Sequence, residues 1–168
     1  DPAHLIAYAN DPAPISFETM PRYAAVPGDT QQVSEIVKLC RQEEMEYTVR
    51  GNGSSVMGFV LGSGLIIDTM RMNKMVFDTS NRAVTIGAGI SAFELQKEAA
   101  SRGYRVNAAE PSALYCANIM CSGIFSLFSS SYGTAADNII DAEFVSEEGN
   151  IFALSQRDAP NLYGFNKN

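Results

Sequence analysis

The chain has 168 residues and a formal net charge of -7, from 12 Lys and Arg against 19 Asp and Glu. This length fits one domain, or two small lobes that share a ligand. The acidic balance argues against nucleic-acid binding, which needs clustered Lys and Arg, but not against a nucleotide held by backbone N–H groups. No apolar run approaches the length of a membrane span.

The three cysteines, Cys40, Cys116 and Cys121, form no C-x-x-C pair. An odd count without that motif argues against a disulfide framework and against a zinc site. We therefore expect a reducing, cytoplasmic setting, and the first residues carry no signal-peptide pattern.

The first elements in chain order are an arm, a strand, a helix and a second strand. Residues 1–20 are rich in Pro and Asp and predict an arm. The run "RYAAVP" predicts a short strand, and Asp29 or Thr30 can cap a helix that continues to about Met45. Val33, Ile36, Val37 and Cys40 fall on one apolar stripe of that helix. "EYTV" predicts the next strand, so the order is that of a βαβ unit with parallel strands.

The second half is richer in strands. "GLIIDT" is typical of a buried strand, and "AVTIGAG" predicts another. Ser91 and Glu94 form a capping box that opens a helix, with Leu95 and Ala99 on one face and Gly103 at its end. "IIDAEFV", the turn "SEEGN" and "IFAL" predict an antiparallel hairpin.

The predicted fold class is therefore α+β, with two α/β subdomains. One is a small parallel βαβ lobe, and the other is a mostly antiparallel sheet lobe with helices. The boundaries that we predict are an arm over 1–20, a first lobe over 21–70 and a second lobe, incomplete at its C-terminus, over 71–168.

The segment "RGNGSS", Arg50 to Ser55, follows the second predicted strand. Ligands gather at the carboxyl ends of parallel strands, and glycines there let backbone N–H groups converge on an anion such as a pyrophosphate. A plain tight turn is the alternative. A Rossmann fingerprint is disfavoured, because Val56 stands where a third glycine is needed and no helical period follows. Arg50 could serve a phosphate or a structural pairing.

The segment 109–138 carries only Glu110 and Asp137 as charged residues. A surface loop is normally more polar. Such a segment could pack around an apolar ring system, or it could be a buried loop packed on its own core. The isolated carboxylates Asp68 and Glu110 are interpreted as solvated strand ends, and Cys116 as a small buried hydrophobe.

Six pieces in this order resemble the FAD-binding domain of the vanillyl-alcohol oxidase / p-cresol methylhydroxylase flavoprotein family. They are "VP" before a helix, "VRGNGSS" against the family's Arg-Gly-Gly-Gly-Thr/His-Ser pattern, "IIDTMRMNK", "VTIGAG", "EPS" with "NIMCSGIFSLFSSSYGT", and "DNIIDAEFVSEEG". The resemblance runs from about Pro21 to Gly149. It implies FAD held between the two lobes.

The resemblance also implies roles for single residues. The pyrophosphate would be wrapped by Gly51, Asn52, Gly53, Ser54 and Ser55, with Arg50 beside them. The flavin and ribityl side would be lined by Pro111, Ser112, Asn118, Ser122, Gly123 and Ser126. Tyr132, Gly133 and Asp137 would close that loop, and Ile139 would approach the adenine side.

Some members of the family attach FAD through a histidine in the glycine loop. Ser54 holds that place here, and the only histidine is His4, so the resemblance implies non-covalent FAD. Within the family, the chain most resembles the glycolate and D-lactate dehydrogenase-like branch. This resemblance implies oxidation of a 2-hydroxy acid by hydride transfer to the flavin. For its localisation we expect a cytoplasmic protein, or one peripheral to the inner face of the membrane.

The family's substrate-binding domain has no counterpart in these 168 residues. We therefore expect this part to be inactive alone, with no catalytic residue assigned in it, and any iron–sulfur cluster to reside in regions outside it. A non-catalytic nucleotide-binding module or a protein-interaction module is the alternative.

Overall fold

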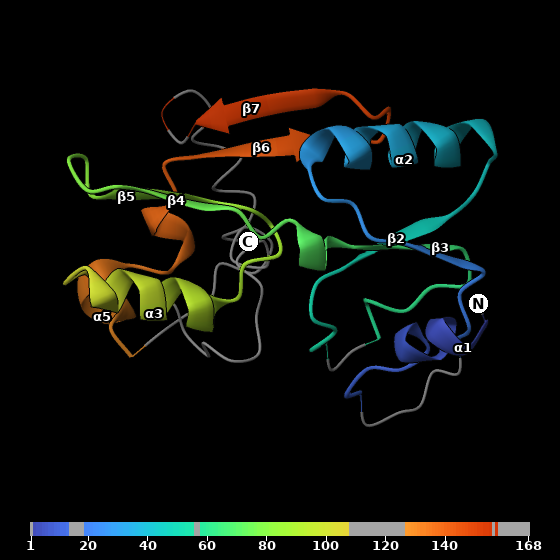
Figure 1. Ribbon diagram of the computed structural model, residues 1–168, viewed down its shortest axis with the longest axis horizontal. Coiled ribbons are helices and arrows are strands. Elements are labelled where there is room, and N and C mark those ends of the chain that lie inside the picture. Colours follow the sequence, from blue (N-terminus) through green and yellow to red (C-terminus); the bar gives the residue numbers. More distant parts are fainter. Residues whose placement is uncertain (1, 14–18, 56–57, 108–126, 156, 158–168) are drawn as a thin grey trace. The chain divides into compact units, whose positions relative to one another are not determined.

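The computed structural model describes residues 2–13, 19–55, 58–107, 127–155 and 157 (Figure 1). The chain divides into two compact units, which are described separately below. Unit 1 comprises Asp1–Met72 and Val145–Ile151, and unit 2 comprises Asn73–Phe144 and Phe152–Asn168.

Unit 1 is built on a three-stranded sheet. Its strands are β1 (Tyr23–Ala25), β2 (Tyr47–Arg50) and β3 (Leu65–Asp68), in the order β1-β3-β2. Both outer strands run parallel to β3. The parallel arrangement is thus confirmed, with the strand of "GLIIDT" inserted between the two strands of the predicted βαβ unit. An apolar run takes the central place because both faces of that strand are covered, and Ile66 and Ile67 are 0% exposed.

Helix α2 (Thr30–Gln42) lies along one face of this sheet (Figure 1). Asp29, one of the two predicted capping residues, is its N-cap, and its carboxylate accepts the Gln32 N–H at 2.8 Å. Val37 and Cys40 of the predicted stripe are buried. The helix ends three residues before the predicted Met45, because Glu44 adopts a left-handed φ of 50° that a helix cannot continue through.

Shorter elements complete unit 1. The predicted arm contains α1 (Pro2–Leu5) and the 3-10 turn η1 (Ile6–Tyr8), which the Pro- and Asp-rich composition did not indicate. The turn η2 (Thr69–Arg71) directly follows β3.

Unit 2 contains the antiparallel strands β4 (Met75–Asp78) and β5 (Ala83–Ile86). The run "AVTIGAG" predicted β5, whereas β4 was not predicted from the sequence. Helix α3 (Ala92–Ser101) has the predicted capping box of Ser91 and Glu94. It packs Leu95 against Ile90, Ala135 and Ala136 in the core. The short helix α5 (Ser129–Tyr132) and the 3-10 turn η3 (Ala136–Asn138) follow.

The strands β6 (Asp141–Val145) and β7 (Ile151–Ser155) form a two-stranded sheet. Because only five residues connect them, the pair is the antiparallel hairpin that the sequence predicts. The rings of Phe144 and Phe152 stack across it, with centroids 5.5 Å apart. Its tip, residues 145–151, belongs to unit 1.

Within the described ranges, no helix has the length and apolar character needed to cross a membrane. The same ranges contain no cluster of three or more His, Cys, Asp or Glu side chains suited to a metal ion.

Candidate functional site

The glycine segment, residues 51–55, begins where β2 ends. Arg50 is the last residue of β2 and pairs in register with Asp68, the last residue of β3. The segment therefore starts at the carboxyl edge of two neighbouring parallel strands, which is the edge where open parallel sheets bind ligands.

Gly53 has a specific reason to be glycine. It is buried and has a φ of +76°. A Cβ at this position would overlap the Arg50 guanidinium, with Cζ at 2.7 Å. The backbone at Gly53 therefore lies directly against the guanidinium, an approach that any side chain would prevent.

The Arg50 side chain lies at the centre of this arrangement. Arg50 is 9% exposed. Its Nη2 donates to the carbonyl of Asn10 at 3.2 Å and, more weakly, to that of Ala7 at 3.5 Å, and its Cζ lies 5.6 Å from the centroid of the Tyr8 ring. Its Nη1 is buried and has no hydrogen-bond partner among the described residues. The structural pairing considered for Arg50 is thus present at Nη2, while Nη1 donates to no acceptor among the described residues.

Asp68 differs from the solvated strand end that its isolation in the sequence suggested. It is 6% exposed. Its Oδ2 accepts the Tyr8 hydroxyl at 2.9 Å, and its Oδ1 accepts the Met70 N–H at 2.9 Å. No local sequence pattern indicates this burial, because the covering side chain comes from Tyr8, sixty residues earlier.

A second set of predicted residues lies in unit 2. Gly133 has a φ of +74°, and its carbonyl accepts the Asn107 amide at 2.7 Å. The Asp137 carboxylate accepts the Thr134 N–H at 2.7 Å and hydroxyl at 2.8 Å, so it fixes the turn after Gly133. Ile139 packs against the core of unit 2, which is a structural role at this position.

Tyr132 is 69% exposed at the end of α5. The remaining predicted flavin-side residues lie outside the described residues, as do Glu110, Cys116 and Cys121. These flavin-side residues are Pro111, Ser112, Asn118, Ser122, Gly123 and Ser126. Their assignment stays a prediction.

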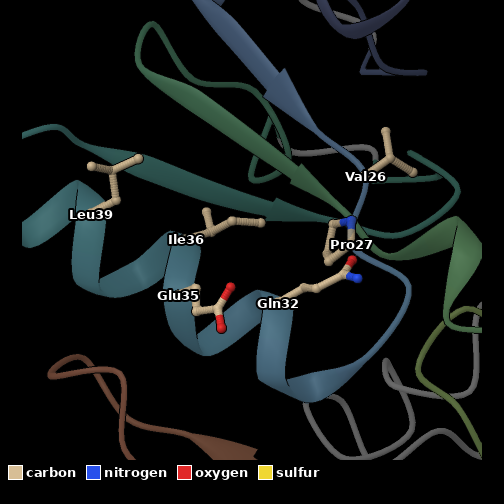
Figure 2. A pocket seen from close by; sticks show the side chains of 6 residues that line it. All are labelled: Val26, Pro27, Gln32, Glu35, Ile36 and Leu39. Atoms are coloured by element: carbon tan, nitrogen blue, oxygen red, sulfur yellow. The ribbon is translucent and has the colours of Figure 1, made fainter.

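Two of the hollows among the described residues contain no predicted cofactor-binding residue. One, of about 300 Å³, lies between the end of β1 and α2 (Figure 2). Its lining consists of Val26, Pro27, Gln32, Glu35, Ile36 and Leu39. The other, of about 330 Å³, lies between β4 and α3 in unit 2. Both are open at the surface, so the glycine segment rather than either hollow is the better candidate for the site.

Within the part of the chain that the structure describes, the groups with shifted pKa values lie outside the predicted site. Burial raises the pKa of the Cys40 thiol, which fits its place in the core under α2. Hydrogen bonds from Asn81, Ser91 and Ser146 lower the pKa of Asp78, Glu94 and Glu148, respectively. These carboxylates accept hydrogen bonds in turns and at the start of α3, so their protonation would change the stability of the fold rather than the predicted site.

The family comparison agrees with the resemblance drawn from the six sequence pieces. The family described as "FAD binding domain" matches residues 21–155. This range includes the glycine segment, both parallel outer strands and the hairpin.

Relatives of this chain include enzymes with different substrates. The (R)-6-hydroxynicotine oxidase of Paenarthrobacter nicotinovorans is 29% identical over 133 residues, which cover 78% of this chain and 29% of the relative. The mitochondrial D-lactate dehydrogenase [cytochrome] 1 of Saccharomyces cerevisiae is 30% identical over 175 residues, which cover 99% of this chain and 29% of the relative.

A solved structure shows the same fold. The 6-hydroxy-D-nicotine oxidase from Arthrobacter nicotinovorans superimposes with a TM-score of 0.83 at 25% identity, over 97% of this chain and 36% of that protein. The chain thus spans about a third of the length of the relatives that it matches. On the family match over residues 21–155, the chain belongs to the FAD binding domain family of the FAD-linked oxidoreductases.

Proposed function

We propose that this chain is the cofactor-binding part of an FAD-dependent dehydrogenase that oxidises a 2-hydroxy acid such as lactate or glycolate. The binding of FAD rests on the family, and the substrate class rests on the D-lactate dehydrogenase of S. cerevisiae, which is 30% identical over 99% of this chain. The (R)-6-hydroxynicotine oxidase is 29% identical over 78% of this chain, so its substrate is the competing class in the test of the proposal.

One observation of the site supports an anionic ligand at the glycine segment. Arg50 is nine-tenths buried, and its guanidinium Nη1 is buried without a hydrogen-bond partner among the described residues. A buried donor on a cation is costly unless an acceptor satisfies it, and the phosphates of FAD are acceptors of the right charge. The residues present therefore fit the pyrophosphate of the cofactor.

In this proposal the residues of the chain bind and orient the cofactor. Arg50 supplies a positive charge, and the backbone of 51–55 supplies N–H groups in a segment whose glycines, Gly51 and Gly53, leave no Cβ in the way of a close approach. When bound, FAD supplies the redox chemistry by accepting a hydride from the substrate. Substrate-orienting residues are proposed to lie in a substrate-binding domain outside this chain, as the lengths of the relatives allow.

The attachment is proposed to be non-covalent. Ser54 stands where some members of the resembled family carry the histidine that bonds the flavin, and His4, the only histidine, lies in α1. The assignments of the residues between 111 and 126 and the position of FAD between two lobes stay predictions.

The test uses the purified protein after incubation with FAD. We expect a yellow complex that releases intact FAD when acid precipitates the protein. Flavin that stays on the precipitated peptide would contradict non-covalent attachment. A colourless protein that does not bind added FAD would favour the alternative of an interaction module.

The substrate class is tested in the intact enzyme under anaerobic conditions. D-lactate or glycolate should bleach the flavin absorbance, whereas (R)-6-hydroxynicotine should not. Bleaching by the nicotine compound alone would overturn the 2-hydroxy acid proposal and leave FAD binding untouched.

A further inference from the structure

We propose that the N-terminal arm, residues 2–13, is a clamp that fixes the glycine segment in its cofactor-binding conformation. Tyr8 and Asp11 are its positioning residues. The inference rests on the proposed function for the identity of the ligand, and on the contacts of unit 1 for the clamp itself.

The arm holds the residue before the glycine segment. The carbonyls of Asn10 and Ala7 accept hydrogen bonds from Arg50 Nη2 at 3.2 and 3.5 Å, and the Tyr8 ring lies 5.6 Å from Arg50 Cζ. These contacts leave the long arginine side chain little rotational freedom. The fixed guanidinium in turn lies against the backbone of Gly53.

The arm also holds a residue beyond the glycine segment. Asp11 Oδ2 accepts the Gly58 N–H at 3.0 Å. The other carboxylate oxygen accepts the Ala13 N–H at 2.9 Å, which fixes the orientation of the Asp11 side chain. Gly58 has a φ of +78°, a conformation that a hydrogen bond to its N–H helps to define. The arm thus contacts the chain on both sides of residues 51–55.

A third contact ties the arm to the edge of the sheet. The Tyr8 hydroxyl donates to Asp68 Oδ2 at 2.9 Å, and Asp68 is the register partner of Arg50. One tyrosine therefore contacts the last residues of both β2 and β3, through its ring and its hydroxyl. A loop fixed in this way before binding loses less conformational entropy when it binds, which favours affinity.

The experiment compares Asp11→Ala and Tyr8→Phe with the wild-type protein. Asp11→Ala removes the acceptor for Gly58, and Asp11→Asn should partly restore it through the amide oxygen. Tyr8→Phe keeps the ring over Arg50 and removes only the hydroxyl. Asp78→Ala is the matched control. Asp78 also accepts a backbone N–H in a turn, that of Asn81 at 3.1 Å, but it lies in unit 2 and does not contact the arm or the glycine segment in any described interaction.

We expect Asp11→Ala to weaken FAD binding about ten-fold and Tyr8→Phe about three-fold in a fluorescence titration. Amide hydrogen exchange at Gly58 and at residues 51–55 should accelerate in both variants without FAD, and not in Asp78→Ala. The exchange readout does not depend on the cofactor, so it tests the clamp even if wild-type protein fails to bind FAD, a result that would instead overturn the proposed function.

Wild-type exchange rates at Gly58 and at residues 51–55 in both arm variants would overturn the clamp. So would wild-type FAD affinity in both variants, or an equal loss in Asp78→Ala. If Asp11→Ala does not fold, Tyr8→Phe decides by the same two measurements.

Discussion

Gly53 and Gly103 have almost the same backbone conformation, with φ values of +76° and +77°, but different surroundings. A Cβ at Gly53 would overlap the Arg50 guanidinium, whereas a Cβ at Gly103 would meet no atom within 4 Å. Substitutions at the two positions therefore distinguish two effects. At Gly103 a side chain adds only the backbone strain of a left-handed residue, whereas at Gly53 it also overlaps the Arg50 guanidinium.

The residue-scale prediction uses this pair. Gly103→Ala should lower the free energy of unfolding by about 1 kcal/mol, from backbone strain alone, and leave FAD affinity unchanged. Gly53→Ala should cost more and also weaken FAD binding at least about ten-fold, because Arg50 must move. Urea unfolding and FAD titration measure the two effects. Equal behaviour of the two variants would contradict the contact between Gly53 and Arg50.

At the scale of elements, α3 begins with a complete capping box. The Glu94 N–H donates to Ser91 Oγ at 3.1 Å, and the Ser91 N–H donates to Glu94 Oε2 at 3.0 Å. The Ser91 hydroxyl also donates to this carboxylate at 2.7 Å. The two bonds that the carboxylate accepts from Ser91 favour its charged form and hold the pKa of Glu94 below its ordinary value of 4.5.

A lowered folded-state pKa gives a pH dependence with a definite sign. The stabilisation from ionised Glu94 is fully present above pH 4.5, the ordinary pKa, and is lost as the pH falls through the folded-state pKa. Glu94→Gln keeps the box but cannot titrate there. Its stability should therefore fall less than that of the wild type between about pH 6 and about pH 3. The measurement is the urea midpoint of the wild type and of Glu94→Gln at each pH. Equal decreases of the two midpoints with acid would show that Glu94 contributes nothing to the acid sensitivity of the wild type.

At the scale of the whole molecule, unit 1 is assembled from two distant parts of the chain. Ser34 on α2 is 1% exposed, and its hydroxyl donates to the carbonyl of Gly149 at the hairpin tip at 2.6 Å. Gly149 is buried, and a Cβ there would lie 2.9 Å from the Ser34 carbonyl. The hairpin tip thus packs tightly on the helix, 115 residues away in sequence.

The corresponding prediction is that Ser34→Ala destabilises the protein by about 1–3 kcal/mol, because it leaves the buried Gly149 carbonyl without its donor. Ser101→Ala is the control, since it removes a similar bond, to the carbonyl of Glu98 at 2.8 Å, at an exposed helix end. Chemical denaturation of both variants checks the difference. A loss below about 0.5 kcal/mol in Ser34→Ala would indicate that water replaces the hydroxyl.

The sequence alone determined the local elements that short-range patterns specify. Asp29 and the Ser91–Glu94 box fix two helix starts, Gly103 fixes a helix end, and the run "LIID" specifies a strand buried on both faces. The ordered motifs around "RGNGSS" also identified the FAD-binding family, since each motif occupies a few consecutive residues.

The tertiary structure alone decided which distant residues support these motifs. Strand β3 lies between β1 and β2, Tyr8 covers Asp68, and the carbonyls of Ala7 and Asn10 hold Arg50. Backbone carbonyls carry no residue-specific signal, and contacts across forty to sixty positions leave no periodicity in the sequence. For that physical reason, the surroundings of Arg50 could be found only in the folded chain.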